Sequence, residues 1–357
     1  MANRAVKFGI IGVGQGGGRL ASEFKKLGYP TVAVNTSPQD LEPIDVDHKL
    51  VIGDGGAGRD TGVGASCLER NKDKVISLLQ RAFQDVQHVI VCAGSSGGTG
   101  GGGVAGMVEI VKSMQLPVGV LTTFPLKSED TRSKKNTIEV LKKLAAKVNE
   151  GEIAPFILMD NEKIIQNYPE LSTAEFWNKA NAEVVKIFDL FNYLSAQNSA
   201  YTSLDPADYK KILGARGCMI FGATSVTSVD SEDSVATALM DNLEKGLLAT
   251  GFNLLTATHA GMMIVGSDGL LRKMPRKAEE KAFSTVHRLL GSGTVYKGVY
   301  CPKKEIQYVE VLTMISGLQL PVARIRDLVE ESKKQMEHLE RKTTLTNVDD
   351  ILKEMGE

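Results

Sequence analysis

Three glycine-rich stretches constrain the fold of this chain more than any other feature of its sequence. They span residues 12–18, 53–64 and 94–103, and each follows a short apolar run that is typical of a buried strand. The third lies within "CAGSSGGTGGGGVAGMVEI", between a strand-like run and a helix-like run. Glycine in such a place either supplies a positive φ or lets another group approach the backbone. A tight turn explains any one stretch, but three together predict a binding crevice.

The spacing of apolar residues in the first half of the chain predicts alternating strands and helices. Strand-like runs begin near residues 5, 31, 86, 116 and 154, and the helical patterns between them cover residues 19–28, 74–83, 104–114 and 134–148. Such alternation is typical of an α/β fold, here a Rossmann-like parallel sheet with helices on both faces.

The position of the glycines in this alternation predicts the class of ligand. Parallel strands direct the turns at their carboxyl ends to one edge of the sheet, so the three stretches are expected to lie together. Bare N–H groups with helix N-termini behind them suit a chain of phosphates better than a single pyrophosphate. We therefore expect a nucleoside triphosphate.

Two common nucleotide motifs fit the first stretch poorly. "GVGQGG" matches the G-x-G-x-x-G dinucleotide fingerprint, but the second strand ends in Asn35 instead of the acidic residue that holds a ribose. No lysine follows the glycines as a P-loop requires. An NAD(P)-dependent Rossmann oxidoreductase stays open as an alternative, and so does a nucleotide-binding regulator that does not polymerise.

Composition excludes several other classes. The formal net charge of -1 leaves no basic excess for bulk nucleic-acid binding, and no apolar run approaches a signal-peptide core or a membrane span. The four cysteines are far apart and form no C-x-x-C pair, which argues against a zinc cage or a disulfide framework and favours a reducing cytoplasm. They are Cys67, Cys92, Cys218 and Cys301.

The rest of the chain predicts a long helix, a second domain and a terminal helix. Residues 173–200 have helical apolar spacing, as expected for a spine between a first domain of residues 1–172 and a smaller α+β domain of residues 201–320. The last segment, 321–357, is a charged helix and tail. An apolar stripe predicts that this helix packs on the second domain; it consists of Ile325, Leu328, Val329 and Met336.

Several motifs together resemble the tubulin/FtsZ family. "SGGTGGG", residues 96–102, resembles that family's signature G-G-G-T-G-[ST]-G, and the resemblance extends in the same order over most of the chain. The other matching segments are "GVGQGGGRL", "AVNTS", "GAGRDTG", the sugar-binding "FPLKSEDTR" and the base-reading "MDNEK". The resemblance implies a cytoskeletal GTPase that binds GTP or GDP, with magnesium bridging phosphate oxygens, and polymerises head to tail.

The resemblance also implies which residues hold the nucleotide. Asn161 and Asn181 would read the base, because a carboxamide both donates and accepts hydrogen bonds, and Phe176 would stack on it. Glu129 would contact the ribose and Arg132 a phosphate. The remaining expected contacts are Gly14, Gln15, Gly16, Gly17, Asn35, Ala57, Gly58, Arg59, Gly97, Gly98, Thr99, Gly100 and Gly101.

The segment "SLDPADYKKIL" resembles the loop that family members insert against the nucleotide of a neighbouring subunit. Asp208 would orient the attacking water and Asp205 would assist it, while no residue is assigned as a metal ligand. The same "DPAD" sequence is also a strong helix start, with aspartate at the N-cap and proline at the first helical position. Capping alone is thus the competing interpretation.

Three positions depart from the family pattern. Ser96 replaces the first glycine of the signature, Gly101 replaces its serine or threonine, and Ser203 replaces the usual asparagine of the activating loop. We expect one hydroxyl contact to phosphate to be replaced by backbone. These departures indicate a divergent prokaryotic, plasmid or phage member, whose C-terminal segment is a candidate site for an adaptor protein.

Overall fold

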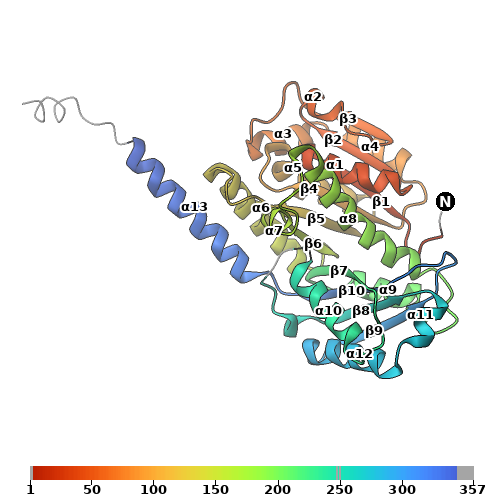
Figure 1. The fold of residues 1–357 in the computed structure, drawn as a ribbon. Coiled ribbons are helices and arrows are strands. Elements are labelled where there is room, and N and C mark those ends of the chain that lie inside the picture. Colours follow the sequence, from red (N-terminus) through yellow and green to blue (C-terminus); the bar gives the residue numbers. More distant parts are fainter. Residues whose placement is uncertain (1–2, 247, 249–250, 344–357) are drawn as a thin grey trace, which may run out of the picture.

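The computed structural model describes residues 3–246, 248 and 251–343, so the predicted tail beyond Thr343 lies outside the described residues. Within the described part, ten strands form one sheet in the order β3-β2-β1-β4-β5-β6-β7-β10-β8-β9 (Figure 1). The strands are β1 (Phe8–Val13), β2 (Thr31–Asn35), β3 (His48–Val51), β4 (His88–Gly94), β5 (Val118–Phe124), β6 (Phe156–Asp160), β7 (Cys218–Val226), β8 (His259–Val265), β9 (Thr294–Tyr300) and β10 (Val309–Leu318).

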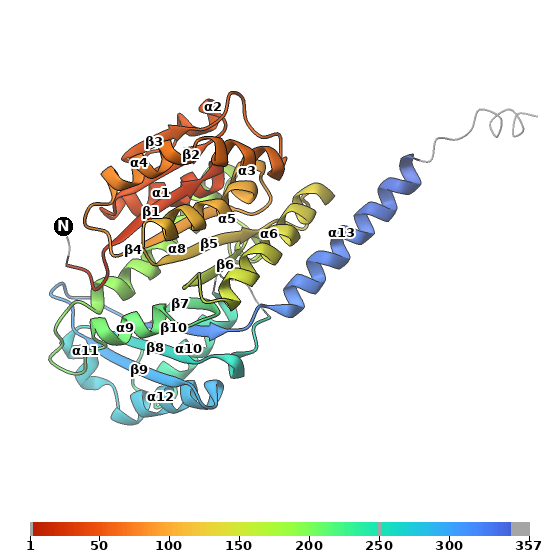
Figure 2. The same cartoon turned by 180° about the vertical axis from the view of Figure 1, so that it is seen from behind.

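Helices cover both faces of this sheet (Figures 1 and 2). They are α1 (Gly14–Lys26), α2 (Pro38–Leu41), α3 (Thr61–Arg70), α4 (Lys72–Ala82), α5 (Gly98–Ser113), α6 (Thr131–Asn149), α7 (Asn161–Asn167), α8 (Thr173–Leu194), α9 (Pro206–Leu213), α10 (Ser234–Lys245), the 3-10 turn η1 (Leu254–Thr256), α11 (Asp268–Lys273), α12 (Arg276–Leu290) and α13 (Val322–Thr343).

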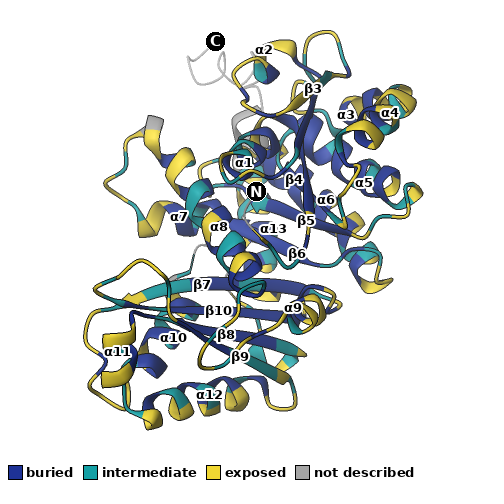
Figure 3. Cartoon of the chain, turned by 90° about the vertical axis from the view of Figure 1, so that its right-hand side faces the viewer, coloured by how far each residue is buried: buried dark blue, intermediate teal, exposed yellow. Residues whose placement is uncertain are grey.

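The first six strands are parallel, and all except the exposed edge strand β3 are largely buried, which confirms the predicted α/β architecture. Every residue of β1, β2 and β6 is buried, because α1 and α8 pack on one face and α3 to α6 on the other. In Figure 3 the labelled strands β4, β5 and β6 are accordingly dark blue over most of their length, while the helices show exposed residues on their outer sides. A strand covered on both faces is apolar throughout, as these runs are.

The second half of the chain continues the same sheet. β7 pairs in parallel with β6 at Phe156↔Cys218 and Ile157↔Met219, and β10 then pairs antiparallel with both β7 and β8. Helices α10 and α12 lie on one face, and α9 contributes to the apolar cluster on the other. One sheet therefore links the two halves, while the boundaries at residues 172 and 201 remain predictions.

The long helix α8 ends at Leu194, six residues before the predicted end near residue 200. The sequence that follows, "SAQNSA", has no apolar stripe to bury. Its hydroxyl groups bond to the backbone: Ser195 Oγ donates to the Phe191 carbonyl at 2.7 Å, and Ser199 Oγ accepts from the Tyr201 N–H at 3.0 Å. Such local side-chain bonds compete with helix continuation.

The terminal helix α13 packs mainly against the first domain and not, as predicted, against the second. It lies along α6 of the first domain and projects away from the body of the molecule (Figure 2). Leu328 of the predicted stripe is fully buried, but polar side chains anchor the helix as well. Arg324 forms a buried ion pair with Asp160 of β6 at 2.7 Å, an attachment that apolar periodicity does not indicate.

Candidate functional site

A cavity of about 600 Å³ lies at the carboxyl ends of β1, β2, β4, β5 and β6. Its wall includes Val13, Asn35, Gly94, Thr123 and Asn161, each within one residue of a strand end. All three glycine stretches reach it, as their positions after strands predict. Fourteen predicted binding residues meet here: Gly14, Gln15, Gly16, Asn35, Ala57, Gly58, Arg59, Gly97, Gly98, Thr99, Gly100, Glu129, Asn161 and Asn181.

Four predicted binding residues do not line this cavity. Gly17 and Gly101 serve backbone packing: an added Cβ would lie 2.1 Å from the Cys92 carbonyl oxygen at Gly17 and 2.5 Å from that of Ser95 at Gly101. Arg132 is more than half exposed and pairs with Asp60 at 3.3 Å. Phe176 is buried among the apolar residues of α1 and α8.

The aromatic side chain in the cavity wall is Trp177, which the sequence analysis missed. Phe176 and Trp177 pack edge to face with ring centroids 4.9 Å apart, and the Phe176 ring turns toward the core. Phe176, expected to stack on the base, instead lies at a core position in the apolar spacing of α8. The signal for its neighbour was available, since Trp177 is the single tryptophan of the chain and lies outside that spacing.

Two helices begin at the cavity with free N-termini. The N-caps of α1 and α5 are Val13 and Gly97, and neither provides a side-chain hydrogen bond to the first turn. By contrast, Asp60 and Asp160 cap α3 and α7 with their carboxylates. The uncapped N–H groups and the positive ends of the α1 and α5 dipoles are therefore directed at the cavity, an arrangement that favours anions.

Buried amide atoms without a partner mark the two ends of the cavity. Asn35 is 2% exposed, and its Oδ1 accepts from the Ser37 N–H at 3.1 Å and from Thr99 Oγ1 at 3.3 Å, which leaves Nδ2 unsatisfied. Asn161 is 6% exposed, and its Oδ1 has no partner. Burying such groups is costly unless a ligand completes their bonds. The cavity thus offers an unpaired donor near the uncapped N-termini of α1 and α5 and an unpaired acceptor directly after β6.

The predicted catalytic acids lie toward the amino ends of the parallel strands, away from the cavity. Asp205 caps α9 by accepting from the Ala207 and Asp208 N–H groups at 2.8 and 2.9 Å, and Asp208 is 3.6 Å from Lys211. Figures 1 and 2 both place α9 on the side of the molecule where the amino end of the chain lies. Neither acid lines the cavity of its own chain.

A larger hollow of about 790 Å³ lies at the amino end of β1. Its lining includes Arg4, Phe8, Gly28 and Arg81. It contains no residue of the three glycine-rich stretches, and neither of the uncapped helices, α1 and α5, begins there. Ligands of open α/β sheets bind at the carboxyl ends of the strands, so the 600 Å³ cavity is the stronger candidate.

The described residues contain no group of three or more histidine, cysteine, aspartate or glutamate side chains that could hold a metal ion. In the same part of the chain, no helix has the length and apolar character needed to span a bilayer. All four cysteines are free thiols, and only Cys301 is exposed.

Comparisons of both the sequence and the structure with known proteins find tubulin-like proteins. Residues 7–169 match the tubulin/FtsZ family, GTPase domain. The tubulin-like protein TubZ of Bacillus cereus is 23% identical over 95% of this chain and 85% of its own length, and the tubulin-like protein CetZ of Pyrococcus abyssi is 27% identical over 91% and 89%. The structure is similar, with a TM-score of 0.87 and 21% identity, to a GTPγS-form protofilament of TubZ from Bacillus thuringiensis serovar israelensis, covering 97% of this chain and 96% of that one.

Proposed function

Residues 7–169 match the GTPase domain of the tubulin/FtsZ family, and on that premise we propose that the chain is a member that polymerises head to tail into filaments whose subunits complete one another's active sites. The observation that carries this proposal is the division of the site. The cavity with the uncapped helix N-termini and the acids of α9 lie toward opposite ends of the strands of one sheet. A second copy stacked on the first brings the two together. Such an interface is heterologous and therefore open-ended.

Within the cavity, each group has a proposed role in holding GTP. The N–H groups that begin α1 and α5 bind the phosphates, and Asn35 Nδ2 donates to a phosphate or ribose oxygen. Asn161 Oδ1 accepts from the N–H edge of guanine, with Asn181 beside it. Trp177 replaces Phe176 as the stacking aromatic, because it lies in the wall.

Magnesium fits this cavity through the nucleotide. The ion keeps several waters and commonly uses one or two carboxylates together with phosphate oxygens. The wall offers the carboxylates of Asp40 and Glu129 and no larger acidic cluster, so bound phosphates would supply much of its coordination. When bound, the ion neutralises charge on the transferring phosphoryl group.

For hydrolysis, we propose that Asp208 of the adjacent subunit positions the attacking water. The backbone N–H of Asp208 donates to Asp205 Oδ1, so the cap of α9 fixes the position of Asp208 at the start of the helix. Phosphoryl transfer depends mainly on positioning and charge stabilisation, and an anchored carboxylate satisfies the first need. Among relatives, a filament of TubZ-Bt with two strands is known.

Nucleotide binding and electron microscopy test the proposal. Purified protein should bind GTP with magnesium far better than ATP or NAD, and it should form filaments with GTP or a slowly hydrolysed analogue. Binding of NAD with GTP ignored would restore the oxidoreductase alternative. GTP binding without self-association at any concentration would instead support the regulator.

We further propose that the protein acts in the cytoplasm and that its C-terminal segment recruits an adaptor. The free thiols support a reducing compartment. A chain that ends at Lys342 keeps nearly all of α13 and should therefore bind GTP normally while losing partner recruitment or filament bundling. Loss of folded protein would show instead that the removed residues belong to the core.

A further inference from the structure

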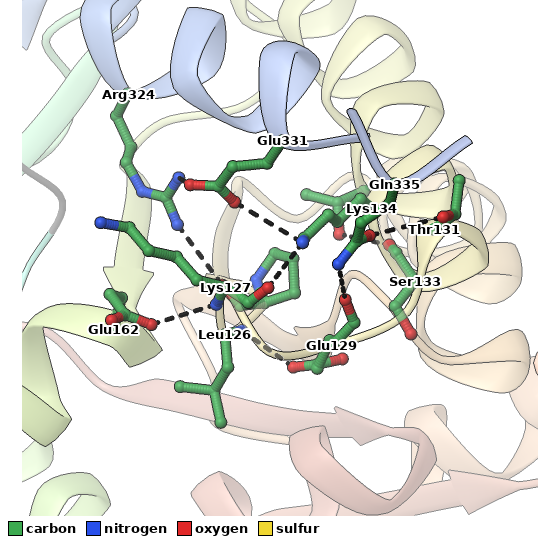
Figure 4. Close-up of polar contacts among 12 residues, drawn as sticks. Leu126, Lys127, Glu129, Thr131, Ser133, Lys134, Glu162, Arg324, Glu331 and Gln335 are labelled. Atoms are coloured by element: carbon green, nitrogen blue, oxygen red, sulfur yellow. Dashed lines mark hydrogen bonds and ion pairs between the residues drawn. The ribbon is translucent and has the colours of Figure 1, made fainter. Parts of the chain in front are cut away.

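Helix α13 contacts the two segments that form one wall of the cavity (Figure 4). One segment is the turn from β6 into α7, residues 160–162, which carries Asn161. The other is the loop between β5 and α6, residues 125–130, which carries Glu129. Figure 4 shows Arg324, Glu331 and Gln335 pointing from α13 toward these segments.

Arg324 holds the first segment through a buried ion pair. Its Nε donates to Asp160 Oδ2 at 2.7 Å, and the two side chains are 6% and 3% exposed. The other oxygen of Asp160 accepts from the Glu162 N–H at 3.2 Å and so caps α7 directly at Asn161. A carboxylate with both oxygens engaged has little freedom to rotate. Arg324 therefore fixes the backbone from which Asn161 projects.

Gln335 holds the second segment. Its Nε2 donates to the Glu129 carbonyl at 3.1 Å, and its Oε1 accepts from Thr131 Oγ1 at 3.4 Å. The two segments are also tied to each other, because the Lys127 N–H donates to Glu162 Oε2 at 3.0 Å. Lys134, only 1% exposed, donates to the Lys127 carbonyl at 2.6 Å and lies 3.8 Å from Glu331.

We propose that Arg324 and Gln335 are positioning residues that set the nucleotide specificity of the cavity. Arg324 aligns Asn161 with the base, and Gln335 aligns Glu129 with the ribose. The proposal rests on GTP binding at this site. It makes α13 a part of the specificity apparatus, although none of the side chains described for this helix lines the cavity wall.

Ratios of nucleotide affinities test this proposal, because they separate alignment from general stability. Gln335→Glu has nearly the same shape and loses the donor to the Glu129 carbonyl. It should reduce the preference for GTP over analogues lacking the 2′- or 3′-hydroxyl by about threefold to tenfold, the effect of one hydrogen bond. Arg324→Lys keeps the charge but loses the planar fork, and it should reduce the preference for GTP over inosine triphosphate similarly.

Lys334→Ala, on the exposed side of α13, is the matched control and should leave both ratios unchanged. If α13 merely stabilises the fold, the variants lower affinity for every nucleotide alike and both ratios stay at the wild-type value, which overturns the proposal. A different result would contradict the proposed function itself: equal affinity of the wild-type protein for GTP and ATP. This measurement is made before any variant is compared.

Discussion

Gly97 and Gly98 are neighbours in the sequence but have different surroundings. A Cβ on Gly98 would lie 2.7 Å from Ala57 Cβ and 2.8 Å from the Asp60 backbone nitrogen, whereas a Cβ on Gly97 has nothing within 4 Å. Gly97 also has φ -83° and ψ 159°, which any residue adopts. Glycine at position 98 is therefore required by the protein itself, and glycine at position 97 leaves space in the cavity.

We expect Gly97→Val to fold normally and to bind GTP more than about tenfold more weakly, since its side chain occupies space meant for the nucleotide at a cost above about 1.4 kcal/mol. Calorimetric titration and thermal unfolding measure the two effects. Gly269→Ala is the control, because Gly269 also has open space but lies on α11. Unchanged GTP affinity in Gly97→Val would place the phosphates elsewhere.

His88 predicts how stability depends on pH. Burial lowers the pKa of His88 from 6.5 to about 4, and its Nε2 has no partner. Between these two values the unfolded chain binds a proton that the native state does not, so this contribution to the free energy of unfolding is complete above pH 6.5 and falls by up to about 3 kcal/mol as the pH approaches 4.

Urea denaturation at pH 7 and pH 4.5 measures this loss. His88→Phe should have a smaller difference between the two pH values than the wild type, whereas His48→Gln, at an exposed position on β3, should retain it. A difference of equal size in wild type and His88→Phe would assign the acid sensitivity to other groups.

For single residues, the sequence predicted the cavity wall correctly where the position of the backbone alone decides which residues line it. Glycines after strands must lie at the sheet edge, so most of the cavity wall was predictable. The direction of side chains was harder to predict. The helical period placed Phe176 on α8 but did not show that the adjacent Trp177 lines the cavity. Gln335 and Arg324 were also missed, because their partners are about 160 to 210 residues away in the chain.

At the scale of elements, α9 carries both an observed helix cap and the proposed catalytic acid, two roles that the sequence could not separate. Asp205 is a helix cap by its observed hydrogen bonds, and Asp208 is free of that task. The two acids should therefore respond differently to removal.

Asp208→Ala should leave GTP affinity nearly unchanged and greatly slow hydrolysis, so filaments should persist because GTP is retained. Asp205→Ala should cost about 1 kcal/mol of stability through loss of the cap. Steady-state phosphate release and thermal unfolding distinguish the two. Normal hydrolysis per polymerised subunit in Asp208→Ala would leave capping as the only role of this sequence.

Elements with strong apolar periods were predictable, and those without them were not. The parallel strands β1, β2, β4, β5 and β6 are continuous apolar runs. The short edge strand β3 is largely exposed and β9 is partly exposed, so neither gave a clear signal. Helix α13 is attached to β6 through the buried pair of Arg324 and Asp160, and an apolar stripe does not indicate which surface a helix covers.

At the scale of the whole molecule, the cavity and the α9 acids lie toward opposite ends of the parallel strands. A single subunit therefore holds only part of the proposed active site. GTP turnover per molecule should rise with protein concentration and then level off once assembly is complete. Phosphate release measured across a dilution series, with light scattering in parallel, checks this. Constant turnover from dilute to concentrated protein would show that one subunit suffices.

The separation of cavity and acids also makes the two ends of any such chain of subunits chemically unequal. A chain of n subunits contains n − 1 completed sites, because the last cavity at one end meets no acids. On the proposed mechanism, the nucleotide there is retained until another subunit arrives, whereas nucleotides in interior subunits are hydrolysed. The state of the bound nucleotide thus indicates how long an interior subunit has been in the filament. The growth rate determines how many subunits behind the growing end still hold unhydrolysed nucleotide.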